Sequence, residues 1–250
     1  MNSNIAQHLA PTGTMRAGVF TGNILLITGT SPTGTPQGVS PDMCQAIADQ
    51  LGVKLELIAF KSQDELVESV ASGACDIGLV GSDPARAKKI TFTPAYVEIE
   101  ATYLVPAGSD IQTVAQVDQP DMRIAVPSRS AYELWLSRNL KHARLVMAEG
   151  FEATINVFLK EQLEALAGLR VALTEDAKKI PGSRLLKENF ATIEQAISTR
   201  NANKAGLAFL TSFVEQAKAS GLVASLIAKH RVNGLVVAPA HLATKQSTVD

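Results

Sequence analysis

The stretch that decides the fold is ACDIGLVGSDPARAKKITFTPAYVEIEATYL, residues 74–104. It begins with a short apolar run at 77–80, which a Gly-Ser-Asp-Pro turn follows, and this pattern predicts a buried strand that ends in a turn. Arg86 comes directly after the turn, and a second β-rich run covers 96–105. Open α/β sheets bind ligands at their strand ends, where a guanidinium suits a carboxylate or phosphate. Arg86 is therefore a candidate anion ligand, and a solvated surface arginine is the alternative.

Composition narrows the function classes. The chain has 250 residues, of which 46% are hydrophobic and 19% charged, enough for one large domain or for two lobes with separate cores. Its net charge is −1 and its Lys and Arg residues are scattered, so we expect small diffusible ligands and no nucleic-acid partner. No apolar run approaches the roughly 20 residues that span a bilayer, so we expect no direct membrane insertion.

The first 18 residues lack the basic and then apolar pattern of a secretory signal. The sequence as written therefore predicts a cytoplasmic protein, unless a signal lies outside it. Cys44 and Cys75 stand inside apolar patterns without metal-ligand spacing, which predicts two buried free thiols and leaves a structural disulfide as the alternative. The four histidines are scattered, and no zinc-protease, serine-hydrolase or phosphate-loop motif occurs. We expect no metal, no cofactor and no catalytic set of these kinds.

The first third of the chain alternates between predicted strands and helices, which indicates a parallel sheet covered on both faces. The segments are strand 15–20, helix 43–51, strand 53–60, helix 63–73 and strand 77–80. Residues 1–13 are predicted to form a loose arm and 28–37 a surface hairpin or loop. Ser40 or Asp42 is the predicted cap of the first helix.

The second half repeats this rhythm. Its predicted segments are strand 122–127, helix 130–140, strand 143–149, helix 152–166, strand 190–199, helices 203–220 and 222–230, and an apolar segment at 235–238. Ser130 and Glu133 stand at capping-box spacing, and the N–H groups of 128–131 form a candidate anion site at the start of a helix. The alternative is a cap that only stabilises the helix.

Motifs spread along the chain resemble those of the type II solute-binding proteins of the polar amino-acid ABC-transporter class, the extracellular solute-binding family 3. They are GVSPD at 38–42; SGACDIG at 72–78, similar to S-G-x-x-D-x-G; PARAK at 84–88 with FTPAY at 92–96, similar to P-x-R-A-x…F-[ST]-x-P-Y; IAV at 124–126 with SRSA at 128–131, similar to V-A-V-x-x-G-S; and KASG at 218–221. Their order and spacing together make the match specific.

The resemblance implies an α/β fold of the two-lobed, periplasmic-binding-protein-like type II class, with two crossing strands as the hinge, near 97–105 and 192–199. The implied boundaries are 14–100 plus 200–238 for lobe 1, 105–192 for lobe 2, and 1–13 and 239–250 for flexible ends. The ligand is expected between the lobes, which close around it by a hinge motion.

The resemblance also implies a set of ligand-binding residues. In the family, the arginine at the position of Arg86 holds the ligand carboxylate, and residues matching Ser128, Ser130 and Ala131 complete this grip from lobe 2. Three lesser contacts are expected at the ends of strands and in the turn: Asn23, Ser82 and Gln195. The alternative role of Asn23 is that of a turn residue.

The sequence departs from the family pattern at three places. The segment between Asp76 and Arg86 is shorter than usual, the first strand ends in Thr-Gly-Asn instead of aromatic residues, and 168–170 lacks the acid that holds an ammonium group. A buried ammonium without a carboxylate is costly, which argues against an ordinary α-amino acid. The missing acid could be replaced by Glu194 or Gln195 on the returning strand, or by Glu98 or Glu100 on the outgoing one. Strand alternation turns only one residue of each pair into the cleft.

The expected function is therefore binding of a small anionic or zwitterionic metabolite, amino-acid-like or an organic acid, as the substrate-binding component of an ABC-type transporter. An ABC permease is the implied partner, and the family implies a periplasmic location. The first alternative is a lyase similar to cyclohexadienyl dehydratase on the same scaffold, with Glu194, Glu98 or Asp83 as its acid. The second is a cytoplasmic metabolite sensor.

Overall fold

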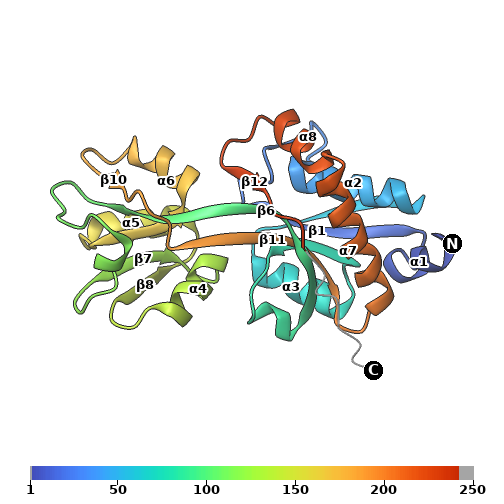
Figure 1. Ribbon diagram of the computed structural model, residues 1–250, viewed down its shortest axis with the longest axis horizontal. Coiled ribbons are helices and arrows are strands. Elements are labelled where there is room, and N and C mark those ends of the chain that lie inside the picture. Colours follow the sequence, from blue (N-terminus) through green and yellow to red (C-terminus); the bar gives the residue numbers. More distant parts are fainter. Residues whose placement is uncertain (1, 242–250) are drawn as a thin grey trace, which may run out of the picture.

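Two lobes joined by two long strands make up the computed structural model, which describes residues 2–241 and the side chains of 5–241. Strands β6 (Ile90–Val105) and β11 (Ala191–Arg200) pair antiparallel and pass from one lobe to the other (Figure 1). One sheet runs through both lobes in the order β4-β1-β5-β11-β6-β9-β7-β8. The predicted two-lobed α/β fold with two crossing strands is confirmed.

Lobe 1 carries both described ends of the chain. Its parallel strands are β1 (Thr14–Phe20), β4 (Lys54–Phe60) and β5 (Ile77–Gly81), and its helices are α2 (Val39–Leu51), α3 (Gln63–Ser72), α7 (Lys204–Ala219) and α8 (Leu222–Lys229). The short strand β12 (Leu235–Val237) adds to β6, and β2 (Gly29–Thr30) with β3 (Pro36–Gln37) forms the predicted surface hairpin.

Two local predictions in lobe 1 are wrong. Helix α2 has Gly38 as its N-cap, and no side chain caps it, because Ser40 instead bonds the Tyr96 hydroxyl at 2.9 Å and Asp42 pairs with Lys229. The arm predicted as loose contains helix α1 (Asn2–Leu9), because Leu9 is fully buried in the lobe 1 core. Residues 242–250 of the predicted flexible C-terminal end lie outside the described residues.

Lobe 2 is built on β7 (Arg123–Pro127), β8 (Arg144–Ala148) and β9 (Ala165–Leu169). Its helices are α4 (Ala131–Asn139), α5 (Phe151–Lys160) and α6 (Arg170–Ala177), and its short strand β10 (Arg184–Leu185) pairs with β6. Each lobe also has a single 3₁₀ turn, η1 (Arg86–Lys88) in lobe 1 and η2 (Val114–Gln116) in lobe 2. The helix predicted over 152–166 is wrong beyond Lys160: Gln162 adopts a left-handed φ of 50°, and 165–169 is a strand between β6 and β7.

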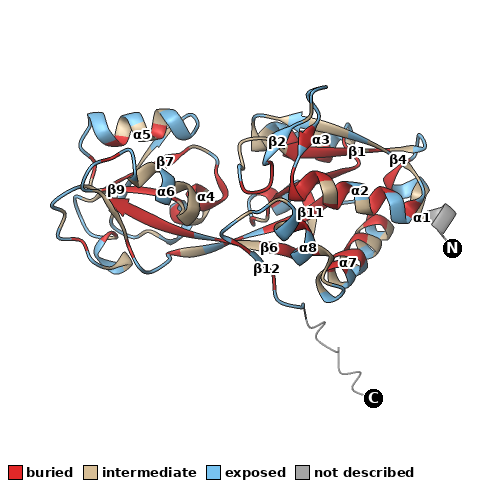
Figure 2. Ribbon diagram, turned by 90° about the horizontal axis from the view of Figure 1, so that it is seen from above, coloured by how far each residue is buried: buried red, intermediate tan, exposed pale blue. Residues whose placement is uncertain are grey.

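Each lobe has its own hydrophobic core, seen as buried strands and helix faces on either side of the connection (Figure 2). Along β6, Ile99 packs into the core of lobe 1 and Ala101 into the core of lobe 2. Along β11 the same change occurs between Ile193 and Ile197. Both connections therefore leave one core and enter the other within a few residues.

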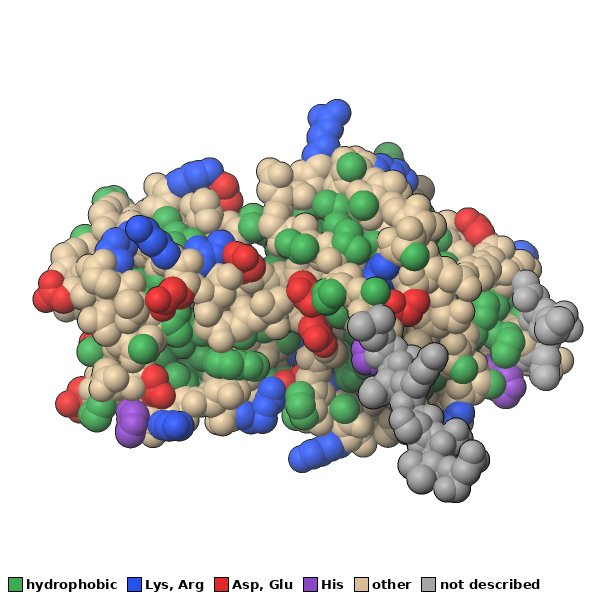
Figure 3. Space-filling model, viewed as in Figure 1, with side chains coloured by type: hydrophobic (Ala, Val, Ile, Leu, Met, Phe, Trp, Pro, Cys, Tyr) green, Lys and Arg blue, Asp and Glu red, His purple; other side chains and the backbone are tan. Residues whose placement is uncertain are grey.

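The surface carries no block of single-sign charge on the face that Figure 3 shows, where Lys and Arg side chains lie among Asp and Glu. This agrees with the scattered charges of the sequence and its net charge of −1. Within residues 2–241, no helix is long and apolar enough to cross a membrane. Cys44 and Cys75 are buried and free, as predicted.

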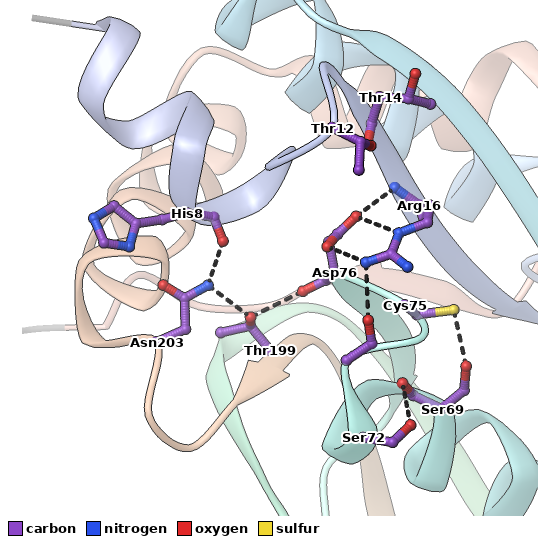
Figure 4. A network of polar contacts seen from close by, with 11 residues as sticks. His8, Thr12, Thr14, Arg16, Ser69, Ser72, Cys75, Asp76, Thr199 and Asn203 are labelled. Atoms are coloured by element: carbon purple, nitrogen blue, oxygen red, sulfur yellow. Dashed lines mark hydrogen bonds and ion pairs between the residues drawn. The ribbon is translucent and has the colours of Figure 1, made fainter.

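A buried ion pair fixes the start of β5. The Asp76 carboxylate lies 2.7 Å from Arg16 Nη2 and also accepts hydrogen bonds from the Arg16 backbone N–H and Nε (Figure 4). The Asp76 carbonyl accepts from the Thr199 hydroxyl, and Asn203 donates to Thr199 and to the carbonyl of His8. The network ties α1, β1, β5, β11 and the start of α7 together at the end of β5 opposite to Gly81, and so fixes the strand on which the site stands.

Candidate functional site

A small cavity lies where β5 ends, opposite the start of α4. Its volume is about 30 Å³, and residues of both lobes line it. Asn23, Gln63 and Gly81 face it from lobe 1, Ala131 and Tyr132 from lobe 2, and Gln195 from β11. The position agrees with the general rule that open α/β sheets bind ligands at the ends of their strands.

Three residues predicted from the sequence converge on Gly81. A Cβ added at Gly81 would lie 2.9 Å from the Ala131 Cβ and 3.3 Å from both Arg86 Nη1 and Gln195 Nε2. Two nitrogen donors and one small side chain therefore surround the same point between the lobes. Of the three, Gln195 and Ala131 line the cavity itself, whereas Arg86 stands on the other side of Gly81.

Arg86 itself lies behind Gly81. It is 4% exposed, and its guanidinium donates to the Gly81 carbonyl at 2.7 Å, to Gln63 Oε1 and to the Arg129 carbonyl at 2.9 Å. Burial lowers the pKa of Arg86 to about 10, which leaves it cationic at neutral pH. Among the described residues its Nε is one of the buried side-chain atoms without a hydrogen-bond partner.

The residues predicted to oppose Arg86 divide between two cavities. Ala131 faces the 30 Å³ cavity, whereas Ser128 and Ser130 line a neighbouring cavity of about 110 Å³. Ser130 caps α4 by accepting from the Glu133 N–H at 3.0 Å, and Glu133 Oε2 accepts from the Arg129 N–H at 3.0 Å. The predicted capping box is therefore half formed: the Ser130 side chain caps the helix as expected, but the Glu133 side chain accepts from the N–H of Arg129 instead of that of Ser130. The Arg129 carbonyl, in a residue with φ of 60°, is the group of this loop that contacts Arg86.

Ser82 lies away from the other predicted residues. Its hydroxyl donates to Glu194 Oε2 at 3.1 Å, and both residues line a cavity of about 660 Å³ between α4 and the turn after β5. The structure thus decides between alternating residues of β11: Gln195 faces the 30 Å³ cavity, and Glu194 does not.

The acids on β6 also point elsewhere. Glu98 lines a cavity with Glu194, and burial together with the Glu194 charge raises the pKa of Glu98. Glu100 pairs with Arg170 at 2.9 Å. No acidic side chain of the described residues lines the 30 Å³ cavity.

Among the lining residues that reasoning from the sequence missed are Phe20, Gln63 and Phe151. Phe20 is the last residue of β1, so an aromatic side chain does stand at the first strand end, directly before the Thr-Gly-Asn segment 21–23. Gln63 begins α3 and accepts a hydrogen bond from Arg86. Its place at the start of a predicted helix, directly after a strand, was the sequence feature that pointed to the site. Phe151 begins α5 in lobe 2, and its approach to the cleft depends on how the lobes meet.

Polar contacts join the lobes beside this cavity. Arg138 of α4 lies 2.6 Å from the buried carboxylate of Asp83, and Arg129 Nη1 lies 3.3 Å from Asp64 of α3. The bond from Arg86 to the Arg129 carbonyl is a third connection. The lobes are therefore in contact beside the cavity.

Comparison with known proteins gives one family. Residues 27–233 match the bacterial extracellular solute-binding proteins, family 3. Solved structures with the same fold include an ancestral amino acid-binding protein described as a precursor of cyclohexadienyl dehydratase, with a TM-score of 0.72, 20% identity and coverage of 90% of this chain and 98% of that one.

Two further structures are similar. The solute receptor for L-cysteine of Neisseria gonorrhoeae has a TM-score of 0.73 and 21% identity, over 92% of this chain and 94% of that one. An amino acid ABC transporter substrate-binding protein of Streptococcus pneumoniae, bound to L-arginine, has a TM-score of 0.72 and 19% identity, over 94% of this chain and 99% of that one. At these identities the likeness establishes the fold.

A curated relative matches a part of the chain. Membrane-bound lytic murein transglycosylase F of Alteromonas mediterranea is 31% identical over 98 residues, which are 38% of this chain and 21% of that protein. The match thus spans about a fifth of the relative's length.

Proposed function

The chain belongs to the bacterial extracellular solute-binding proteins of family 3, and on that premise we propose that it binds a small carboxylate-bearing metabolite between its lobes and presents it to an ABC permease. The observation that carries the proposal is the convergence of Arg86 Nη1, Gln195 Nε2 and Ala131 on Gly81, at the contact of the two lobes. The ligand is amino-acid-like or an organic acid, and the family's extracellular character supports a periplasmic location.

Arg86 is the carboxylate clamp in this proposal. Its guanidinium now donates to protein oxygens, among them the Arg129 carbonyl of lobe 2. A ligand carboxylate is a stronger acceptor than a carbonyl because the hydrogen bond is then charge-assisted on both sides. The ligand takes over the position of the Arg129 carbonyl, Gln195 Nε2 donates to its second oxygen, and Asn23 contacts the remainder. Ser128 and Ser130 position the α4 start, and Ser82 is a peripheral contact.

The two bodies that separate and close are 14–100 plus 200–238 and 105–192. Their motion takes place in β6 and β11, where Ile99 and Ala101 belong to different cores. Entry of a ligand requires that Arg138 leave Asp83 and Arg129 leave Asp64, since these pairs now hold the lobes together. Closure around the ligand restores them.

Binding without chemistry fits the position of the acids better than a lyase does. A general acid must reach the reacting group directly or through one water. Glu194 and Glu98 line other cavities, and Asp83 is committed to Arg138. We therefore propose a binding protein even though a precursor of cyclohexadienyl dehydratase shares the fold.

A thermal-shift screen against amino acids, 2-oxo acids and hydroxy acids tests this function. A ligand of the native state adds about 2.7 kcal/mol of stability at 100 times its dissociation constant. We expect a carboxylate to stabilise the wild type and the Arg123→Ala control, and to have no effect on Arg86→Ala. Mass spectrometry after incubation should recover the ligand unchanged. Conversion of the ligand would contradict the binding function, and so would a panel without any hit.

A further inference from the structure

A larger, mainly apolar cavity lies beside the cavity at Gly81. A second cavity of about 210 Å³ shares Asn23, Tyr132, Phe151 and Leu169 with the first. We call it the annex. The loop 22–25 of lobe 1 forms one wall, with Ile24 and Leu25. Strand β9 and helices α5 and α6 of lobe 2 form the other, mainly through apolar residues such as Ile155, Leu166, Ala172 and Leu173, with the charged residues Glu175, Asp176 and Lys179 toward the end of α6.

The two cavities differ in what they can hold. A volume of about 30 Å³ is enough for one or two waters, by the rule that one water needs roughly 10–15 Å³. The end of a ligand that displaces them is of carboxylate size. The annex has about seven times that space, so most of a ligand bound across both cavities lies in the annex.

Polar groups on the annex wall are already paired with neighbours on their own helix or loop. Thr154 donates to the Gly150 carbonyl at 2.7 Å, Asp176 pairs with Lys179, and Glu175 pairs with Lys178. Asn23 Oδ1 accepts from the Leu25 N–H at 3.2 Å. Most of the remaining lining residues are apolar, so a charged or amide side chain buried against them would lose its hydration, which is unfavourable.

Exposed apolar side chains mark the rim of the annex. Ile24 is 60% exposed and Phe151 is 40% exposed, and they are two of the five exposed large hydrophobic residues found among the described residues. They face the annex from opposite lobes. An apolar ligand group would cover both at once when the lobes close on it, which is favourable in proportion to the area removed from water.

We propose that the annex receives the aliphatic or aromatic side chain of the bound acid, so that the preferred ligand is a carboxylate with a bulky apolar side chain. This specificity rests on the proposed function, because Arg86 and Gln195 must hold the carboxylate for the side chain to enter the annex. It separates this chain from the L-cysteine and L-arginine binding named for the similar structures.

Calorimetric titration with matched acids tests the specificity. L-Leucine is compared with L-alanine, and 4-methyl-2-oxopentanoate with pyruvate, since each pair shares its polar end and differs in side chain. The larger acid should bind about 10- to 100-fold more tightly, the range that burial of one large aliphatic side chain gives. L-Lysine and L-glutamine should bind more weakly than the large apolar acids.

Filling the annex should remove this preference. Ile155→Trp places a larger side chain in the annex, and Leu159→Trp is its control four residues later on α5, where the side chain is 49% exposed and outside the annex. Ala172→Phe fills the annex from α6 if Ile155→Trp fails to fold. We expect both filling variants to bind small and large acids equally, and the control to keep the preference.

Two outcomes overturn the inference separately from the function. Binding of L-lysine or L-glutamine as tight as that of the large apolar acids, or an unchanged preference in both filling variants, removes the annex as the side-chain site but leaves a carboxylate-binding protein. Wild-type protein that binds no acid of the panel removes the function and the specificity together.

Discussion

Arg138 of lobe 2 lies 2.6 Å from the carboxylate of Asp83 in lobe 1, and this ion pair closes the cleft at the side of α4. The Asp83 side chain is 3% exposed and that of Arg138 39%. Loss of the Arg138 side chain leaves the buried Asp83 carboxylate without its ion-pair partner. Because Arg138 is partly exposed to water, the free-energy cost is reduced to about 1 to 2 kcal/mol. The closed arrangement of the lobes should be weakened by that amount.

Arg138→Gln should therefore shift the lobes toward an open arrangement. Trp135 is the chain's single tryptophan and lines the cavity between α4 and the turn that carries Asp83, so its fluorescence reports the change. We expect stronger quenching by acrylamide in the variant. Arg123→Gln is the matched control, because its pair with Glu164 lies within lobe 2. Equal quenching in Arg138→Gln and the control would show that the pair does not hold the cleft.

Gly81→Ala should block ligand binding without unfolding the protein. The new Cβ would lie 2.9 Å from the Ala131 Cβ, closer than side-chain carbons approach, so the lobes cannot close around a ligand. Gly29→Ala is the control, since a Cβ there has no neighbour within 4 Å. We expect calorimetry to detect no ligand binding by Gly81→Ala and normal binding by Gly29→Ala. Normal affinity in Gly81→Ala would place the ligand elsewhere.

Asp76→Asn should cost stability and leave ligand affinity unchanged. The carboxylate is 2% exposed and pairs with an Arg16 side chain that is 28% exposed, so its neutralisation costs about 2 to 4 kcal/mol. For a chain of this size, the loss lowers the melting temperature by about 4 to 16 °C. Asp110→Asn, at an exposed aspartate, should have little effect. A melting temperature of Asp76→Asn equal to that of Asp110→Asn would contradict the structural role of the network.

Glu98→Gln should stabilise the protein at neutral pH. Glu98 stands opposite Glu194 in the β6–β11 pairing, and its pKa is raised by burial and by the Glu194 charge. An acid with a raised native pKa binds more protons in the native than in the unfolded state, so unfolding free energy falls as pH rises through that interval. The gain in Glu98→Gln should be about 0.2 to 1 kcal/mol above the interval, the usual size for opposed like charges.

The pH dependence separates this effect from a change in packing. Below the unfolded pKa of a glutamate, about 4.3, wild type and Glu98→Gln should have the same stability, because both side chains are neutral. Denaturant titrations at about pH 3, more than one unit below that pKa, and at pH 7 measure the difference. A stabilisation of the same size at both pH values would assign the effect to packing.

The fold was largely predictable because its order of apolar strands and amphipathic helices follows local patterns. The helix predicted over 152–166 shows the limit: the apolar residues Leu163 and Leu166 continue the helical spacing, yet Gln162 turns the chain and β9 pairs between β6 and β7. Pairing with strands distant in sequence overrides local periodicity here. Similarly, Leu9 draws the N-terminal segment into the lobe 1 core.

The candidate site was predictable only in part, where a residue's place in a turn, at a helix start or on a strand face determines its direction. Arg86, Ala131 and Gln195 converge on Gly81. Because side chains alternate along a strand, only one of Glu194 and Gln195 on β11 could face the same side. Phe151 and the pair of Arg138 with Asp83 depend on the approach of one lobe to the other. No local pattern contains that information. The position of Ser82 depends on the same approach, because its turn faces Glu194 and α4.

The central claim, that Arg86 holds a ligand carboxylate between the lobes, is tested most directly by comparing an acid with its amide. Calorimetry should measure binding of 4-methyl-2-oxopentanoate and of its amide, neither of which carries an ammonium group, to wild type and to Arg86→Lys, which retains a charge but loses the planar fork. We predict that only the acid binds wild type and that Arg86→Lys weakens it at least tenfold, about 1.4 kcal/mol. Equal binding of acid and amide, or an unchanged affinity in Arg86→Lys, would contradict the claim.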